Sequence, residues 1–369
     1  MSTHRSSDIS EQLRDRVRAA YERKEPLRVV AGDSKAFLGN RVDGDLLDLS
    51  DHRGIVSHEP TELVVTVRAG TPVKDLMATL EAAGQMLPFE PPMHTDGATI
   101  GGVTACGLSG PRRPHVGAVR DFILGTRILN GRSDLLRFGG EVMKNVAGYD
   151  VSRLMAGAHG TLGVLLDISF KVLPRPELEV TLTREANCAE ALREFNALAT
   201  QPVPVSGAAW VSGRTYLRLS GTELGVRAAS KLLGWEVDGN GEAFWAKLRD
   251  QKLPFFTDES ALWRLSLPPD APLDKALDGS LEGHGIDSSQ MHTLLDWGGA
   301  QRWVKTDQDA PAVWQAAKAA GGHATCYRGA AHDGVFQPLP GPLLAVHRRI
   351  KDAFDPAGIL NPGRMYQEI

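Results

Sequence analysis

Apolar and polar residues in the first 174 positions follow the periods of mixed helices and strands. A polar start passes into a stretch of helical spacing behind Asp8, with Glu11 placed as a capping-box partner. The apolar residues of this stretch share one face: Ile9, Leu13, Val17 and Tyr21. The pattern predicts an opening helix.

Three later segments in this half read as strands. Residues 27–30 form a short apolar run that enters the small, polar turn 31–35. Residues 62–69 predict a second strand, followed by a helix with Thr71 as N-cap and Pro72 in its first turn. Residues 164–173 predict a buried strand that ends at a Pro-Arg-Pro sequence.

Glycine marks two further features of the first half. Residues 122–129 and 134–138 predict a hairpin that turns at Asn130-Gly131. Residues 97–110 hold glycine too densely for an ordinary helix, so the backbone there is expected to approach another group closely or to adopt positive φ.

The second half repeats one order of elements. Strand, helix, strand, strand, helix occurs across 180–233 and again across 262–321, which predicts a pair of ferredoxin-like βαββαβ units. A last helix over 343–354 precedes a Pro/Gly-rich tail that should be pinned to the body. We therefore expect an α/β (α+β) fold with domains at 1–174 and 175–340 and a C-terminal segment, 341–369, that returns to the first domain.

Composition excludes several classes of protein. Among 369 residues, 41 basic and 45 acidic side chains give a net charge of -4, which offers no general field for nucleic acid or an anionic membrane. No signal peptide or membrane-spanning run is present, which predicts a cytoplasmic protein without direct membrane insertion. Three distant cysteines encode neither a disulfide framework nor an iron–sulfur cluster, so any such centre would lie on another chain.

Small residues in the first half are the best candidates for binding chemistry. The turn Gly32–Lys35 has the backbone character of a phosphate cradle, although on that signal alone a plain surface turn is the commoner outcome. Further glycine patches follow at 97–102, 109–110 and 157–163, and they fit a backbone that wraps an extended ligand as well as glycine-mediated packing. Rossmann, P-loop, zinc-protease and serine-esterase motifs are absent.

The same residues resemble a known family, the FAD-binding proteins of the vanillyl-alcohol-oxidase and para-cresol-methylhydroxylase (PCMH) type. GDSK resembles its pyrophosphate loop, TDGATIGG with GLSG its second flavin-contacting segment, and GAHGTLGV its adenine-side turn. DPAGILNPGRM resembles the tail of its lactate and glycolate dehydrogenase branch. EVMKNVAGYDVSRLMAGAHGTLG is most similar to the FAD-binding subunit of bacterial glycolate oxidase complexes.

The resemblance implies a two-part PCMH-type FAD-binding domain with a cap domain, and a set of FAD contacts. Those contacts are Gly32, Asp33, Ser34, Lys35, Gly97, Ala98, Thr99, Ile100, Gly101, Gly102, Ser109, Gly110, Gly160, Thr161, Gly163 and Val164. Covalent members anchor flavin through a histidine in the first loop, where this chain has Asp33 and Ser34, so non-covalent FAD is expected. No catalytic base is nominated, and Arg364 is the one candidate for a catalytic role, on either the substrate side or the flavin side.

The resemblance also implies an activity and partners: oxidation of glycolate or a similar small 2-hydroxy acid, with electrons passed to a second FAD-containing catalytic subunit and an iron–sulfur subunit. Membrane association would then come only through those partners. Catalytic relatives carry a histidine-rich metal site in the second domain, whereas the histidines here are scattered and no metal site is expected: His284, His292, His323 and His332. Two alternatives stay open, namely a stand-alone FAD oxidase or dehydrogenase for another substrate, and a non-catalytic assembly or electron-relay subunit.

Overall fold

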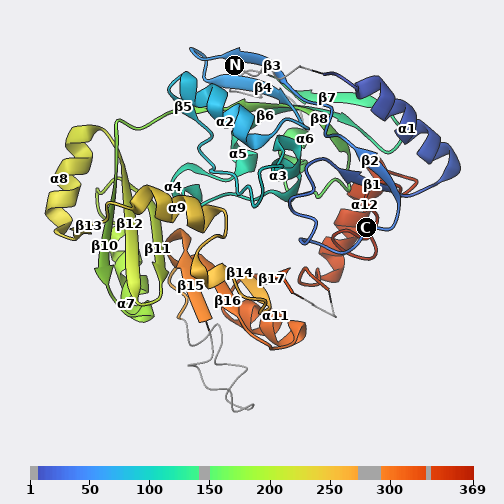
Figure 1. The fold of residues 1–369 in the computed structure, drawn as a ribbon. Helices are drawn as coiled ribbons and strands as arrows, with labels where there is room; N and C mark the ends of the chain where they lie inside the picture. Colours follow the sequence, from blue (N-terminus) through green and yellow to red (C-terminus); the bar gives the residue numbers. More distant parts are fainter. Residues whose placement is uncertain (1–6, 141–149, 273–291, 330–333) are drawn as a thin grey trace. The chain divides into compact units, whose positions relative to one another are not determined.

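The computed structural model describes residues 7–140, 150–272, 292–329 and 334–369. Contacts divide the chain into two compact units (Figure 1). The first comprises Met1–Gly110, Gly117–Arg175 and Pro338–Ile369, and the second comprises Pro111–Val116 and Pro176–Gln337. Within the described residues, no helix has both the length and the apolar character needed to cross a membrane.

The first unit is built on a five-stranded antiparallel sheet in the order β3-β4-β8-β6-β7. Its strands are β3 (Ile55–Glu59), β4 (Val64–Arg68), β8 (Val164–Lys171), β6 (Ile123–Leu129) and β7 (Leu135–Gly139). The central strand β8 buries six of its eight residues, which matches the buried strand expected there. Two short pairs accompany this sheet: β1 (Leu27–Val30) with β2 (Asp45–Asp48), and β5 (Gln85–Met86) with β9 (Leu173–Pro174).

The helices of the first unit are short apart from those near its termini. They are α1 (Ser10–Arg23), α2 (Val73–Ala82), α3 (Ile100–Cys106), α5 (Val119–Phe122), α6 (Val151–Leu154) and α12 (Gly341–Phe354). In Figure 1, α3, α5 and α6 lie on the same side of the five-stranded sheet. The end of β1, the loop that follows it and α3 contribute to the candidate site.

Two capping expectations in this unit were wrong. Helix α1 has no side-chain cap, because Asp8 instead accepts from the Ser10 amide at 2.9 Å and pairs with Arg127 at 3.2 Å. Pro72 occupies the N-cap position of α2, while Thr71 Oγ1 accepts from the Gly54 amide at 2.9 Å. In both places a tertiary partner outcompetes the local cap.

The glycine-rich segment was expected not to be an ordinary helix, yet it contains α3. Thr99 caps this helix by accepting from the Gly102 amide at 3.3 Å. The close approach itself is confirmed, since a Cβ on Gly101 would lie 2.6 Å from Ala69 Cβ. Glycine is therefore used here to pack a helix tightly against the end of β4.

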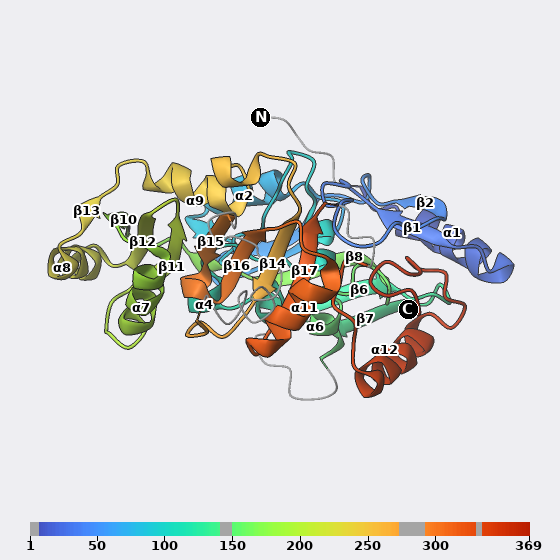
Figure 2. The ribbon, with the colours of Figure 1, turned by 90° about the horizontal axis from the view of Figure 1, so that it is seen from below.

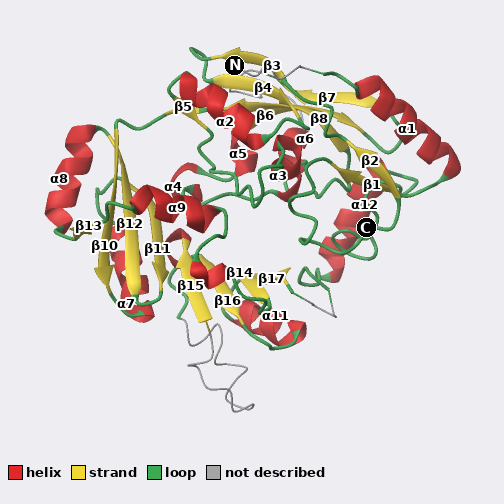
Figure 3. Ribbon diagram, in the orientation of Figure 1, coloured by secondary structure: helices red, strands yellow, loops and turns green. Residues whose placement is uncertain are grey.

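The second unit contains one eight-stranded sheet in the order β13-β10-β12-β11-β15-β16-β14-β17 (Figure 3). Its strands are β10 (Leu178–Glu185), β11 (Val205–Val211), β12 (Arg214–Gly221), β13 (Glu236–Val237), β14 (Leu262–Ser266), β15 (His292–Asp296), β16 (Gln301–Lys305) and β17 (His323–Arg328). Its helices are α4 (Arg113–Val116), α7 (Cys188–Leu198), α8 (Glu223–Leu233), α9 (Gly241–Arg249) and α11 (Ala310–Ala319), with 3-10 turns η1 (Pro254–Phe256) and η4 (Trp297–Gly299).

The sheet joins two ferredoxin-like halves, as the repeated order of elements predicts. Strands β13-β10-β12-β11 have the order fourth-first-third-second of one unit, and β17-β14-β16-β15 repeat it. Where the second half should have its first helix, between β14 and β15, residues 273–291 lie outside the described part of the chain. The α+β fold class with a ferredoxin-like cap is confirmed.

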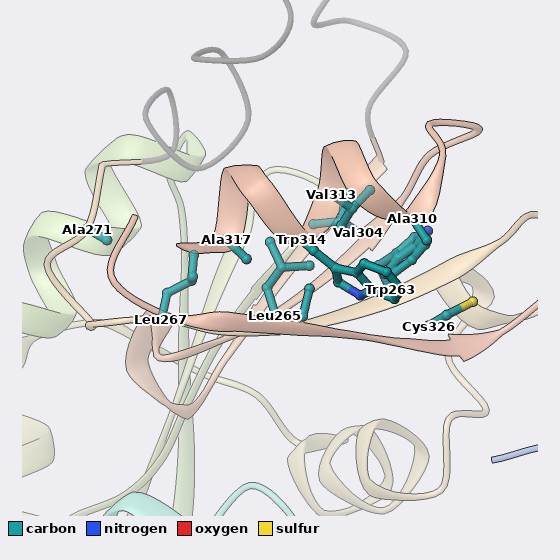
Figure 4. Packing of buried hydrophobic residues seen from close by; sticks show 11 residues of the cluster. Trp263, Leu265, Leu267, Ala271, Val304, Ala310, Val313, Trp314, Ala317 and Cys326 are labelled. Carbon is teal, nitrogen blue, oxygen red and sulfur yellow. The ribbon is translucent and has the colours of Figure 1, made fainter. Parts of the chain in front are cut away.

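Helices α7, α8 and α11 cover one face of this sheet, while Trp245 of α9 donates to Thr181 of β10 on the other face. Helix α11 lies along β14, β16 and β17 (Figure 2), and its Val313 and Trp314 pack on Trp263 and Leu265 of β14 (Figure 4). Helices α7 and α8 cover the other end over Leu295 and its neighbours. All seven tryptophans are buried or partly buried.

The C-terminal tail is pinned to the first unit, as expected. The buried amine of Lys351 donates to Asp355, to Thr161 O and to Leu360 O, each at 2.8 Å. Burial lowers the pKa of Lys351 below its ordinary value, and the Asp355 carboxylate opposes that effect. Through these bonds, Lys351 holds the end of helix α12 against residues 355–360, which lead to Asn361.

Candidate functional site

A cavity of about 100 Å³ lies within the first unit at the end of β1. Strand β1, the loop after it, helix α3 and the C-terminal tail all contribute to its wall. The lining residues are Arg28, Val29, Val30, Ala31, Gly32, Asp33, Ser34, Lys35, Val42, Thr99, Gly102, Ala105, Cys106, His159, Asn361 and Arg364. Segments from four parts of the sequence thus meet at one hollow.

The loop after β1 presents unused backbone donors to this cavity. In the described part of the chain, the amides of Gly32, Asp33 and Ser34 donate to no acceptor. Asp33 has a φ of 45°, and a left-handed residue among successive amides is typical of an anion-binding nest. Gly32 is required because a Cβ there would lie 1.6 Å from Gly97 O.

The charges around the cavity are mainly positive. Arg28 pairs with Asp33 at 3.2 Å, and Asp33 is the one acidic residue among those that line the cavity. The buried side chain of Lys35 has its Nζ 3.1 Å from Ser34 Oγ. The lining thus has three cationic side chains, those of Arg28, Lys35 and Arg364, and one carboxylate beside a row of unused amides. This arrangement favours a ligand with negative charge, such as a diphosphate.

Arg364 holds the same loop in shape. Its guanidinium donates to Asn40 O at 2.8 Å, to Leu38 O at 2.5 Å and more weakly to the carbonyls of Lys35 and Ala36. Burial lowers the pKa of Arg364 below its ordinary value. The structure thus gives this residue a clamping role on 35–40, while its candidacy for contact with substrate stays a prediction.

Asn361 and His159 are far apart in sequence but adjacent in the cavity wall. Asn361 Oδ1 accepts from the Val29 amide and its Nδ2 donates to His159 O, both at 2.8 Å. Burial lowers the pKa of His159 to about 4, with a further contribution from Arg364, so the imidazole is neutral at pH 7. Burial raises the pKa of the Cys106 thiol, which is therefore a neutral wall group as well.

Only part of the expected FAD set lines the cavity. Of the residues named from the sequence, the lining includes Gly32, Asp33, Ser34, Lys35, Thr99, Gly102 and the catalytic candidate Arg364. Within the described contacts, Ser109 Oγ accepts from the Val119 amide, and the Gly110 amide donates to Phe89 O.

The remaining expected contacts do not line the cavity. Ala98, Ile100 and Gly101 are buried around the start of α3, whereas Gly97 is exposed and lies beside Gly32. Thr161, Gly163 and Val164 are buried, and Gly160 is half-buried beside Asn361. Their contact with a cofactor stays a prediction.

Several lining residues were not named from the sequence. No sequence motif marks four of them, because only the fold brings these residues to the cavity: Arg28, Val42, Ala105 and Cys106. Asn361 does lie in the tail motif NPGR that carried part of the resemblance, and that motif was the available signal.

Comparison with known proteins agrees with this geometry. The chain matches a family model described as "FAD binding domain" over residues 8–139, and one described as "FAD linked oxidases, C-terminal domain" over 339–365. The first match contains β1, its loop and α3, and the second contains the tail that holds them.

Individual relatives extend the match to the whole chain. The glycolate oxidase subunit GlcE of Escherichia coli is 50% identical over 99% of both chains. The glycolate oxidase subunit GlcD of Bacillus subtilis is 33% identical over 38% of this chain and 30% of its own length. Among solved structures, p-cresol methylhydroxylase superposes with a TM-score of 0.72 at 15% identity, covering 98% of this chain and 88% of that one.

The expected resemblance is confirmed by these matches, and so is FAD as the cofactor of the family. The p-cresol methylhydroxylase match supports the fold alone, whereas the full-length match at 50% identity supports descent. This chain belongs to the family of the glycolate oxidase subunit GlcE, a family of FAD-linked oxidoreductases.

Proposed function

We propose that this chain is the non-covalent FAD-binding subunit of a glycolate oxidase complex. In that complex glycolate, or a similar small 2-hydroxy acid, is oxidised to the 2-oxo acid. The observation that carries the proposal is the row of unused amides at Gly32, Asp33 and Ser34 beside Lys35, inside a cavity of the family's FAD-binding domain. The full-length likeness to a glycolate oxidase subunit supplies the substrate class.

The cavity fits the diphosphate of FAD. We assign the pyrophosphate to Gly32–Lys35, where amides and one amine could donate to its oxygens. The flavin half would lie along Gly97–Gly102 and Ser109–Gly110, and the adenosine half along Gly160–Val164. The loop 31–35 contains no histidine, cysteine or tyrosine for a covalent link, which supports non-covalent binding.

Oxidation of a 2-hydroxy acid removes a hydride from carbon and a proton from the hydroxyl group. Bound FAD supplies the hydride acceptor, while the protein supplies position and electrostatics. Here Arg364 and Asn361 keep the anion-binding loop in place, and His159 is neutral at pH 7, so it adds no positive charge for the diphosphate. Electrons would leave for a second FAD-containing subunit and an iron–sulfur subunit. The iron–sulfur centre would lie on another chain, because the three cysteines of this chain lie far apart in sequence.

These partners would also decide the location of the complex. We propose a cytoplasmic subunit that reaches a membrane, if at all, through its partners. Co-purification with a tagged chain from its own host, followed by iron analysis, tests both partners. A tagged chain that retains neither a second flavoprotein nor iron contradicts the proposed assembly.

The activity is tested by the visible spectrum of the purified chain before and after anaerobic glycolate, followed by acid precipitation. Yellow colour that is released by acid and bleaches with glycolate is the expected result. Colour that is released but stays oxidised, and bleaches only when the partner subunits are added, would move the reaction to the partner. A folded chain that takes up no FAD would contradict the cofactor assignment.

A further inference from the structure

Two arginines of the second unit share one tryptophan ring. The guanidinium carbon of Arg113, in α4, lies 4.2 Å from the centroid of Trp297, and that of Arg264, in β14, lies 5.3 Å from it. Cations over an aromatic face are held by the ring's negative potential. Two positive groups are therefore concentrated at one place in the cap sheet.

These groups lie on the sheet face away from the core helices. Trp263 and Leu265 of β14 pack under α11, so Arg264 between them projects from the opposite face. Its register partner is Trp303 of β16, and Gln301 of the same strand shares that face. The site is thus built on strands of the second unit, whereas the cavity at β1 belongs to the first unit.

A chain of polar groups orients Arg264. Asp296 Oδ2 accepts from Gln301 Nε2 at 3.0 Å, and Gln301 Oε1 accepts from Arg264 Nε at 2.7 Å. The two terminal amino groups of Arg264 make no hydrogen bond and no ion pair with any described residue. A fixed guanidinium with both terminal groups unused has the geometry that binds a carboxylate through two parallel hydrogen bonds.

The tryptophan itself is held in an uncommon conformation. Trp297 is buried and has a φ of 54°, and Gly298 and Gly299 after it also have positive φ. Such strain in a bulky residue is characteristic of binding and catalytic sites. Asp296 helps to impose it, because its Oδ1 accepts from the Trp297 amide at 2.7 Å.

The titration behaviour of a neighbour agrees with an excess of positive charge. His323 pairs in register with Ser266 at the end of β14. Burial, and then the charges of Arg264 and Arg113, lower its pKa below the ordinary value. Asp296 also faces the cluster, and its Oδ1 accepts from the Trp297 amide while its Oδ2 accepts from Gln301 Nε2.

We propose that Arg264, supported by Arg113 on Trp297, binds the carboxylate of a small 2-hydroxy acid. This inference rests on the proposed function for the identity of the acid. The proposal places recognition of the substrate carboxylate on the eight-stranded sheet of this chain's second unit. Arg264 is then a substrate-binding residue, and Gln301 and Asp296 are positioning residues behind it.

Calorimetric titration of the full FAD-loaded chain with glycolate, and with uncharged glycolamide, tests the site. We expect glycolate to bind and glycolamide to bind far more weakly. Arg264→Gln should weaken glycolate binding by about 10- to 100-fold, and Arg264→Lys by less, because charge remains while the fork is lost. Arg184→Gln is the matched control, since Arg184 lies 4.7 Å over Trp235 in the same sheet and should leave binding unchanged.

Flavin bleaching by glycolate, followed in parallel, separates the two proposals. Equal glycolate binding by wild type and both Arg264 variants overturns the carboxylate site, whether or not bleaching occurs. Absence of glycolate binding by the wild type also overturns it. Binding that depends on Arg264 without any bleaching supports the site and contradicts catalysis by this chain.

Discussion

Asn361 Oδ1 accepts a hydrogen bond from the Val29 amide at 2.8 Å, across 332 residues of sequence. The same side chain donates to His159 O, and the Asn361 amide donates to Leu27 O. One residue of the tail thus joins the first strand to the turn at His159. These bonds join three segments that line the candidate FAD cavity: β1, the turn at His159 and the tail.

Replacement of Asn361 by alanine should therefore cost stability. Asn361→Ala leaves the Val29 N–H and the His159 carbonyl without partners, which should lower the free energy of unfolding by about 2–4 kcal/mol. Asn361 has a φ of 42°, so Asn361→Gly loses the same bonds without the backbone strain and should be about 1 kcal/mol less destabilised. Urea unfolding followed by circular dichroism measures both, and an alanine variant as stable as wild type would contradict the bridging role.

Arg364 should control cofactor affinity through the loop carbonyls. Arg364→Lys keeps the positive charge but cannot donate at once to the carbonyl oxygens of Asn40, Leu38, Lys35 and Ala36. We expect FAD affinity to fall by about tenfold or more, since each lost hydrogen bond is worth about 0.5–1.5 kcal/mol. Quenching of FAD fluorescence on binding measures this affinity.

The same variant separates clamping from substrate contact. If Arg364 bound the hydroxy acid, Arg364→Lys would raise the KM for glycolate at saturating FAD and leave FAD affinity unchanged. That pattern would contradict the clamp and restore the residue to the substrate side.

Gly32 should tolerate no side chain. A Cβ at this position would lie 1.6 Å from Gly97 O, so Gly32→Ala must displace the loop from α3. FAD binding should weaken by about tenfold or more, because displaced amides forfeit hydrogen bonds to charged oxygens worth about 1.5–3 kcal/mol each. Gly341→Ala is the control, since its Cβ would meet no atom within 4 Å. Equal FAD affinities for the two variants would contradict the close approach.

Elements with a clear local period were predictable from sequence. Strand β1 and the buried strand β8 appear where their apolar runs lie, and the order of elements in the second unit produced both ferredoxin-like halves. The loop after β1 was also identified, because glycine and small polar residues next to a strand are a local signal.

Features that depend on distant partners were not predictable in this way. Asp8 was expected to cap α1, but its carboxylate is used by Arg127, 119 residues away. The hairpin of β6 and β7 was correctly expected. In its turn, however, the residue with positive φ is Ser133 and not Gly131. A Cβ on Gly131 would lie 2.2 Å from Asp355 Oδ1, so glycine is needed there for the tail. Local propensity cannot report such a contact.

His159 should make stability depend on pH. The unfolded chain binds a proton at this imidazole below about pH 6.5, whereas the folded chain does so only near pH 4, because burial lowers the pKa. The free energy of unfolding should then fall as the pH falls from 6.5 towards 4, and by about 2 kcal/mol at pH 5 from this group alone. The contribution is complete above pH 6.5 and is lost through that window.

His159→Asn isolates this effect, since asparagine accepts the φ of 51° at this position and carries no titrating group. Urea unfolding of the FAD-free protein at pH 7.5 and pH 5.0 should show a loss about 2 kcal/mol smaller in the variant than in wild type. Equal losses would mean that the imidazole is protonated in the folded cavity. A protonated His159 would add a fourth cation to the lining, and FAD affinity would then rise on acidification in wild type and not in His159→Asn.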